Sequence, residues 1–262
     1  MDLQLAGSVA LVTAASKGLG KAAALALARE GAAVILNARS ELVERAAEDI
    51  AAQTGAQTLA VRGNLARAED VERLVGAGLE RFGRIDILIA NAGGPPPGGF
   101  LALKPADWEN AFQLLVMSTV RLCYAVLPGM IERGSGSIIA SQSFTVKLPM
   151  ENLILSNSIR MAVVGLMKSL ADEVGPKGIR VNTINPGWTL TERVDQLLGS
   201  RAKQNGSTTE VEMAKTTAAI PLRRMAAAEE YGRVVAWLAS PAAAYITGQS
   251  IQVDGGITRT AL

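Results

Sequence analysis

Ser156 and Arg160 are the most informative polar pair in the stretch NLILSNSIRMAVVGLMKSLA, residues 152–171. Because they lie four residues apart on a predicted helix, their side chains share one face. The Arg160 guanidinium can fork onto hydroxyl oxygens, but it does not release its proton at useful pH. The Ser156 hydroxyl is a weaker acid than a tyrosine phenol, whose ordinary pKa is about 10. The pair therefore predicts binding rather than efficient proton transfer.

Another residue must then supply any proton that the chemistry needs. Lys147 and Glu151 lie in FTVKLPMEN, residues 144–152, between Ser143 and Ser156. A lysine in a buried site can donate a proton, so Lys147 is a candidate donor. The alternative is that both residues are loop charges in water. The tyrosines are interpreted as structural; they are Tyr124, Tyr231 and Tyr245.

A second group of residues has the spacing of a phosphate site, in VALVTAASKGLGKAAALALA at 9–28. It predicts a strand, a turn of small residues and a helix whose N-terminal N–H groups suit a pyrophosphate. Gly18 and Gly20 could instead serve only the tight packing of strand on helix. Lys17 in the turn and Arg39 after the next strand suit the extra phosphate of NADP. As exposed charges, either could also simply be solvated.

The elements that must position these residues alternate along the chain. Short, almost continuously apolar runs predict buried parallel strands at 8–13, 32–37, 57–62, 85–91, 136–141, 179–185 and 250–254. Amphipathic segments predict helices at 18–30, 41–53, 68–82, 105–133, 152–174 and 227–239. This alternation predicts an α/β fold over residues 1–262, a single-domain Rossmann-type doubly wound sheet of about seven parallel strands.

Two stretches interrupt this rhythm. GGPPPGGF, residues 93–100, predicts a loop that is stiff at its prolines and permissive at its glycines. Residues 192–220 form a long polar excursion after a strand, which we interpret as a loop-like substrate lid. A merely mobile insertion is the alternative.

Composition excludes several function classes. With 26 basic and 24 acidic residues the chain has no nucleic-acid footprint. Without histidine the sequence lacks the commonest metal ligand, and we expect no metal site. The apolar runs are short, and MDLQLAGSVALVT lacks the basic start of a signal peptide. The single cysteine, Cys123, fits a reducing compartment, so we expect a cytoplasmic protein without a membrane segment.

Four motifs in order resemble those of the short-chain dehydrogenase/reductase family over nearly the whole chain. TAASKGLG at 13–20 resembles its Thr-Gly-x-x-x-Gly-x-Gly turn, with Ala14 in place of the first glycine. NAG at 91–93, NPGWTLTER at 185–193 and YITGQSIQVDGG at 245–256 are similar to later motifs. The resemblance is to members like 3-oxoacyl-ACP reductase.

The resemblance implies a nicotinamide dinucleotide cofactor, and Lys17 and Arg39 favour NADP(H) over NAD(H). It implies that Pro186, Gly187 and Thr191 flank the nicotinamide, and that Asn64 replaces an aspartate that contacts adenine. The implied cofactor-binding residues are Thr13, Ala15, Ser16, Lys17, Gly18, Leu19, Gly20, Arg39, Asn64, Leu65, Asn91, Ala92, Gly93, Arg160, Pro186, Gly187 and Thr191.

The family's catalytic tetrad is altered here. The resemblance implies an Asn, a Ser, a Tyr and a Lys, of which only the serine is present, as Ser143. Counting thirteen and then four residues onward gives Ser156 and Arg160 in the places of Tyr and Lys, and Leu115 falls in the place of Asn. The tyrosine would protonate a carbonyl as hydride arrives, and the lysine would lower its pKa and hold the ribose. The candidate catalytic residues are therefore Ser143, Ser156, Arg160 and Lys147.

Two interpretations remain open. One is an NADP(H)-dependent oxidoreductase with altered proton-donor machinery, acting on a small molecule with a carbonyl, an alcohol or an activated double bond. The other is a catalytically weak or inactive NADP(H)-binding scaffold or regulatory protein. Relatives in the family are commonly tetramers, and Ala162, Val163, Gly165 and Leu166 suit such an interface, or else face the sheet.

Overall fold

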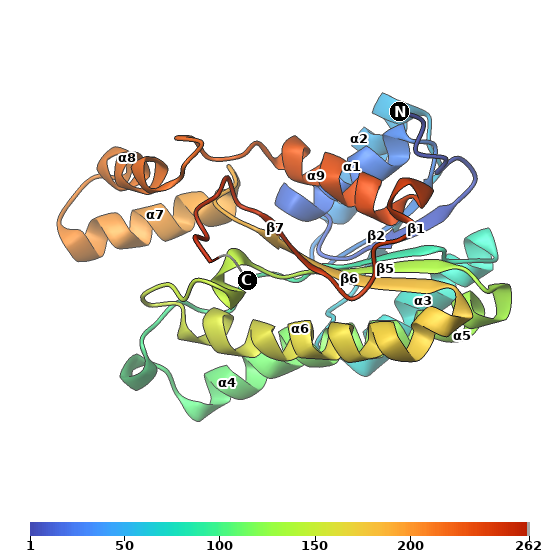
Figure 1. The fold of residues 1–262 in the computed structure, drawn as a ribbon, viewed down its shortest axis with the longest axis horizontal. Helices are drawn as coiled ribbons and strands as arrows, with labels where there is room; N and C mark the ends of the chain where they lie inside the picture. Colours follow the sequence, from blue (N-terminus) through green and yellow to red (C-terminus); the bar gives the residue numbers. More distant parts are fainter. Residues whose placement is uncertain (261–262) are drawn as a thin grey trace.

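The computed structural model describes residues 1–260 as one parallel sheet covered by helices (Figure 1). The strand order is β3-β2-β1-β4-β5-β6-β7. Its strands are β1 (Val9–Val12), β2 (Ala33–Ala38), β3 (Thr58–Arg62), β4 (Ile87–Ala90), β5 (Gly136–Ser141), β6 (Ile179–Pro186) and β7 (Ser250–Val253). The predicted doubly wound sheet of seven parallel strands is confirmed. Residues 261–262 of the predicted domain lie outside the described residues.

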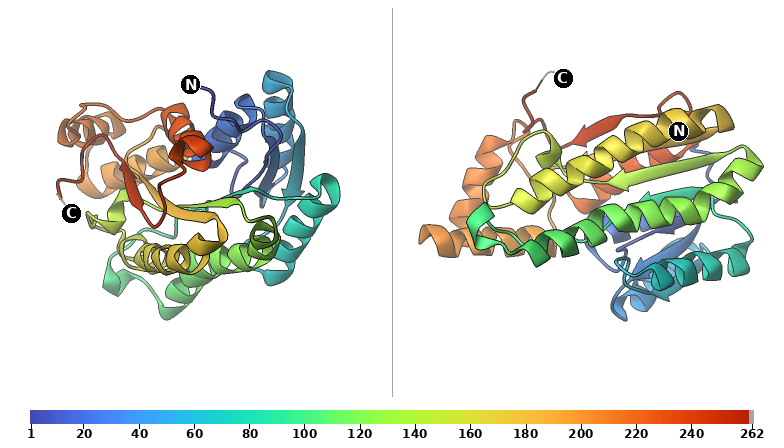
Figure 2. Two further views of the ribbon diagram at one scale, coloured as in Figure 1. Left: turned by 45° about the vertical axis from the view of Figure 1, so that its right-hand side comes forward. Right: turned by 90° about the horizontal axis from the view of Figure 1, so that it is seen from below.

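Helices cover both faces of the sheet, as Figures 1 and 2 show. One face carries α1 (Gly18–Arg29), α2 (Leu42–Thr54) and α9 (Ala228–Ala239). The other carries α3 (Ala68–Phe82), α5 (Ser118–Arg133) and α6 (Ile154–Val174). Because both faces are covered, the strand side chains are buried in both directions, and β1 and β4 are buried at every residue.

The helix predicted at 105–133 is not uniform. The structure divides it into α4 (Pro105–Phe112), a π-helical turn (Gln113–Met117) and α5. By length and composition this run could cross a membrane. In this fold its inward side chains, among them Leu122, Val126 and Met130, belong to the core cluster against the sheet. The run is therefore a core helix here.

Residues 192–220 are not the long loop that their polarity suggested. They form α7 (Glu192–Asn205) and α8 (Thr209–Ala219), which pack against each other. Val194, Leu198 and Ala202 recur at helical spacing and are buried, so a narrow apolar stripe holds α7 in place. The stripe is short between polar residues, which explains why polarity dominated the sequence-based interpretation.

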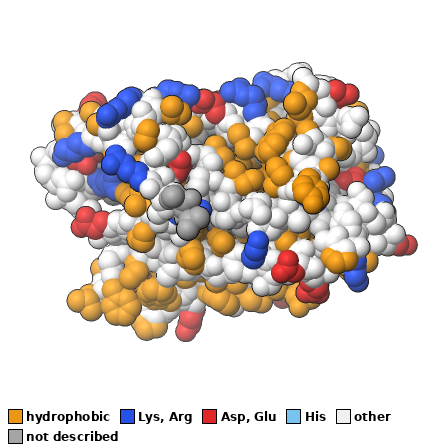
Figure 3. All heavy atoms as spheres, in the orientation of Figure 1, with side chains coloured by type: hydrophobic (Ala, Val, Ile, Leu, Met, Phe, Trp, Pro, Cys, Tyr) orange, Lys and Arg blue, Asp and Glu red, His pale blue; other side chains and the backbone are white. Residues whose placement is uncertain are grey.

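The residues of α6 considered for an interface point in different directions, some toward the core and some toward solvent. Val163 is fully buried in the core, so at this position the alternative orientation toward the sheet is correct. Ala162 and Gly165 are exposed. Figure 3 shows a separate gathering of hydrophobic side chains over α4 and the turn before it, where Phe100 and Leu101 are 66% and 96% exposed.

Candidate active site

A cavity of about 1300 Å³ lies at the carboxyl edge of the sheet. Residues that directly follow β2, β4, β5 and β6 line it, together with the turn before α1 and the start of α7. The strand order reverses between β1 and β4, and this is where open α/β sheets bind ligands. One cavity therefore joins the predicted phosphate turn to Ser143, Ser156 and Arg160.

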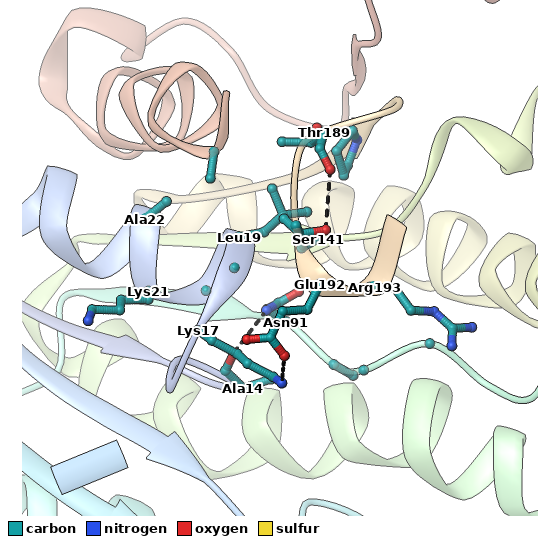
Figure 4. A pocket seen from close by; sticks show the side chains of 18 of the residues that line it. Ala14, Lys17, Leu19, Lys21, Ala22, Asn91, Ser141, Thr189, Glu192 and Arg193 are labelled. Atoms are coloured by element: carbon teal, nitrogen blue, oxygen red, sulfur yellow. Dashed lines mark hydrogen bonds and ion pairs between the residues drawn. The ribbon is translucent and has the colours of Figure 1, made fainter. Parts of the chain in front are cut away.

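The turn before α1 has no room for larger residues. A Cβ on Gly20 would lie 2.3 Å from the carbonyl oxygen of Ala14, and Gly18 adopts φ +57°. This close approach leaves the N-terminus of α1 open toward the cavity, the arrangement that suits a pyrophosphate. Asn91 donates from Nδ2 to the Ala14 carbonyl at 3.5 Å and thereby ties the turn to the loop after β4 (Figure 4).

Ala14 adopts φ +48°, in the left-handed region that favours glycine. Such a backbone costs an L-residue about 1–2 kcal/mol, whereas a glycine here would lose about 0.4–1 kcal/mol through the unfolded chain. We therefore expect Ala14→Gly to stabilise the protein by about 1 kcal/mol and to raise Tm by about 2–4 °C. Thermal unfolding followed by circular dichroism measures this. Ala15→Gly is the control, and it should lower Tm because Ala15 is fully buried and outside the left-handed region.

Charged residues lie at the phosphate end of the cavity. Lys17 forms an ion pair with Glu192, the first residue of α7, so the phosphate turn contacts α7 directly (Figure 4). Arg39 is exposed and lines the cavity. Among residues 1–260, no carboxylate lies within ion-pair distance of Arg39. Its charge is thus free to meet a ligand.

The serines at the centre of the cavity make different contacts. The Ser143 Oγ accepts a hydrogen bond from the Thr145 backbone N–H at 3.2 Å. The Ser156 hydroxyl is paired with the Thr145 Oγ1 at 3.2 Å, and both side chains are buried. Ser156 therefore packs against the segment after β5. Its short side chain does not extend into the cavity as a larger polar side chain would.

Arg160 is 6% exposed and belongs to the cavity wall. Its Nη1 donates to the Ser141 carbonyl at 3.4 Å and to Gln142 Oε1 at 3.5 Å, both long contacts. Burial lowers the pKa of Arg160 to about 10, and the positive charge of Arg193 acts in the same direction. The group is still a cation at neutral pH, and it faces a second cation.

Tyr231 lies behind this wall. Its hydroxyl donates to Ser141 Oγ at 2.8 Å, and the side chain is 1% exposed. Burial raises the pKa of Tyr231 above its ordinary value, although the hydrogen bond to Ser141 opposes the shift. Because Tyr231 is not part of the cavity lining, its phenol has no direct path to a ligand. This fits the structural interpretation of Tyr231.

Most of the residues expected at the site line this one cavity, and three do not. Thr13 and Ala15 are fully buried, and the Thr13 hydroxyl bonds to the backbone oxygen of Asn91 at 2.7 Å, so these two residues hold strands together. Lys147 is exposed and outside the lining, because the short turn Phe144–Val146 directs the chain away from the cavity. The structure therefore does not place Lys147 in the cavity, where a proton donor was expected.

Sequence reasoning missed Arg193, Gln142 and Thr145 at the site. Gln142 and Thr145 lie on either side of Ser143, and Arg193 is the last residue of NPGWTLTER, but only the folded chain brings them to the cavity. Phe144 and Trp188 both line the cavity, with ring centroids 6.1 Å apart. Leu115 is 2% exposed in the core, and its neighbour Leu114 in the π-helical turn lines the cavity instead.

Comparisons with known proteins agree with this geometry. A family model described as enoyl-(acyl carrier protein) reductase matches residues 13–258. Oxidoreductase UcpA of Salmonella typhimurium is 36% identical over 258 residues, which are 97% of this chain and 96% of UcpA. The 3-oxoacyl-[acyl-carrier-protein] reductase of Synechocystis is 34% identical over 255 residues, 97% of this chain and 98% of the relative.

A solved structure is equally similar. L-Sorbose reductase from Gluconobacter frateurii, complexed with NADPH and L-sorbose, has a TM-score of 0.94 and 34% identity, over 99% of this chain and 100% of that chain. The matched range 13–258 contains the phosphate turn, the loop after β4 and the segment after β6. Motifs, sheet order and whole-chain similarity all agree: the chain belongs to the short-chain dehydrogenase/reductase family, a family of oxidoreductases.

Proposed function

We propose that the protein is an NADP(H)-dependent oxidoreductase with altered proton-donor machinery. The observation that carries the proposal is the single cavity that joins the phosphate turn to Ser143 and Arg160. Its substrate is a small molecule with a carbonyl, an alcohol or an activated double bond. An activated double bond needs the least acid assistance, so it suits a site that lacks the family tyrosine.

The residues present fit a nicotinamide dinucleotide. The turn passes so close to Gly20 that no side chain fits there, and the open N-terminus of α1 suits the pyrophosphate. Thr191 lies beside Gly18, because a Cβ on Gly18 would meet Thr191 Cγ2 at 3.5 Å. The segment expected to flank the nicotinamide therefore adjoins the phosphate turn. A bound nicotinamide cofactor supplies or accepts a hydride at its C4 carbon. Arg160 would hold the ribose hydroxyls, and the hydroxyl of Ser143 would position the substrate oxygen.

Holding and orienting two reactants can contribute more than the missing acid. Alignment contributes about 7–11 kcal/mol, whereas a positioned general acid contributes about 10²–10⁴-fold in rate. Loss of the tyrosine therefore favours slow or altered chemistry over none. Fluorescence titration with NADPH, followed by NADPH consumption with ketones, enones, quinones and imines, tests the proposal. Absence of any cofactor signal would overturn it.

We expect Arg39→Ala to weaken NADPH binding by about 10–100-fold and to leave NADH binding unchanged. Arg39 is unpaired among the described residues, and a charged hydrogen bond to phosphate contributes about 1.5–3 kcal/mol. Fluorescence titrations with both cofactors measure the ratio. Arg45→Ala, which removes an exposed charge outside the cavity, is the control and should change neither affinity. Equal losses for NADPH and NADH would contradict the NADP preference.

The second candidate function is a nucleotide-binding scaffold. It is favoured by Leu115, which is packed in the core, and by Ser156, whose hydroxyl is already paired with Thr145. Firm NADPH binding without turnover in any substrate class would support it.

The assembly and location of the protein are part of the proposal. The exposed outer faces of α5 and α6, with Tyr124 at 77% and Met161 at 48% exposure, support a homo-oligomer, and we propose a tetramer. The thiol of Cys123 is buried, and burial raises its pKa to about 12, so it is inert, as a cytoplasmic protein allows. Size-exclusion chromatography with light scattering tests the tetramer.

A further inference from the structure

Among the arginines that line the cavity, Arg160 and Arg193 are withdrawn from solvent, and neither has an ion-pair partner in the described part of the chain. Arg160 is 6% exposed, and its Nε is buried without a hydrogen-bond partner. Arg193, on the first turn of α7, is partly buried and lines the same cavity. Across residues 1–260, no carboxylate lies within ion-pair distance of either guanidinium. Two cations in one cavity wall, neither paired with a carboxylate, require an explanation beyond stability.

The protein's own hydrogen bonds leave most of these donors unused. Arg193 Nη2 donates to the Pro95 carbonyl at 2.9 Å, and the guanidinium packs against Gly94. Arg160 uses only Nη1, in the two long contacts to Ser141 and Gln142. A guanidinium has five N–H donors, so each group is anchored on one side and keeps free donors on another. In Figure 4, Arg193 extends away from Lys17 and Asn91, so it does not lie at the phosphate turn.

Burial without a partner is costly for a charged group, and a neighbouring like charge adds to the cost. Burial lowers the pKa of Arg160, and the charge of Arg193 lowers it further. An anion that binds in the cavity would relieve both effects. A guanidinium fork in the place of the family lysine suits a flat, two-oxygen anion better than a point charge does.

Apolar side chains also line the cavity. Phe144 and Trp188 are each 6% exposed, and Leu153 and Leu197 line the same cavity. We propose that the substrate is an organic acid whose carboxylate binds Arg193 and those N–H donors of Arg160 that do not hold the ribose, with its apolar body against Phe144 and Trp188. This inference rests on the proposed oxidoreductase function.

The test measures binding of an unreactive acid, so it does not depend on turnover. Isothermal titration calorimetry compares 3-phenylpropanoate with 3-phenylpropanamide on the protein saturated with NADP⁺. We expect the acid to bind roughly 10–100-fold tighter than the amide, since charge-assisted hydrogen bonds are the stronger kind. Arg193→Gln should remove this preference, and Arg193→Lys should retain part of it. Lys203→Gln, which removes an exposed charge of the same helix outside the cavity, should leave it intact.

The cofactor pyrophosphate is the other source of an anion, and the same variants separate the two. We expect the NADP⁺ affinity of Arg193→Gln to change by less than about 3-fold. A larger loss of NADP⁺ affinity together with an unchanged acid preference would assign Arg193 to the cofactor and overturn the proposal. Equal binding of acid and amide to the wild-type protein would overturn it as well. Absence of cofactor binding is a separate result, which contradicts the proposed function.

Discussion

Replacing Ser156 by Tyr together with Arg160 by Lys raises ketone reduction by about 10²–10⁴-fold over the wild-type level, if the proposed function is right. Ser156 belongs to the cavity wall, so a tyrosine ring there enters open space and brings a phenol toward Ser143. The positive charge of the lysine introduced in place of Arg160 lowers the pKa of the phenol, which makes it a better proton donor. Because Leu115 still occupies the place of the family's asparagine, we expect a gain in rate toward the lower end of this range. Initial rates of NADPH oxidation with a panel of ketones measure the effect.

The control for this variant is Ser156→Phe with Arg160→Lys, which introduces the ring without its hydroxyl. Both variants remove the Thr145–Ser156 hydrogen bond, so both should lose about 1 kcal/mol of stability and about 2–4 °C in Tm. Only the tyrosine variant should gain activity, and Ser143→Ala added to it should remove the gain. Equal rates in the Tyr and Phe variants, with cofactor binding intact, would show that the missing acid does not limit the reaction.

The sheet could be predicted from the sequence because its strands are apolar almost without interruption. That pattern follows directly from burial on both faces, as in β1 and β4. The helices α7 and α8 were missed because their buried stripe is narrow and their loop-like polarity is strong. The π-helical turn within 105–133 was also missed, because its apolar composition does not differ from that of the helices on either side.

The candidate site was predictable where a motif fixes the backbone, and less so where contacts between distant segments decide. Gly18 and Gly20 are recognisable because a turn without Cβ atoms has few alternatives. Lys147 was misplaced because its distance along the chain from Ser143 says nothing about the direction that the short turn between them takes. Arg193 carried no local signal, and its position depends on loop 93–100 nearly a hundred residues earlier.

Gly20→Ala should weaken NADPH binding by at least about 100-fold, equivalent to about 2.8 kcal/mol. The new Cβ would meet the Ala14 carbonyl oxygen at 2.3 Å and Ala15 Cα at 2.9 Å. Both are backbone atoms of the phosphate turn, so neither can rotate away as a flexible side chain would. Ala14 is already in the left-handed region, and the turn has no spare conformation to adopt. Fluorescence titration measures the affinity, and far-ultraviolet circular dichroism shows whether the fold is retained.

A steric cause predicts a sharp contrast with another helical glycine. Gly76 is exposed on α3, and a Cβ there would have no neighbour within 4 Å. Gly76→Ala should therefore leave NADPH binding unchanged and stabilise the protein by about 0.5–1 kcal/mol, because alanine favours the helix. A loss of NADPH affinity in Gly20→Ala but not in Gly76→Ala would place the cause of the loss at the phosphate turn. Wild-type affinity in Gly20→Ala would instead mean that the turn moves aside, and that the close approach to Ala14 serves packing alone.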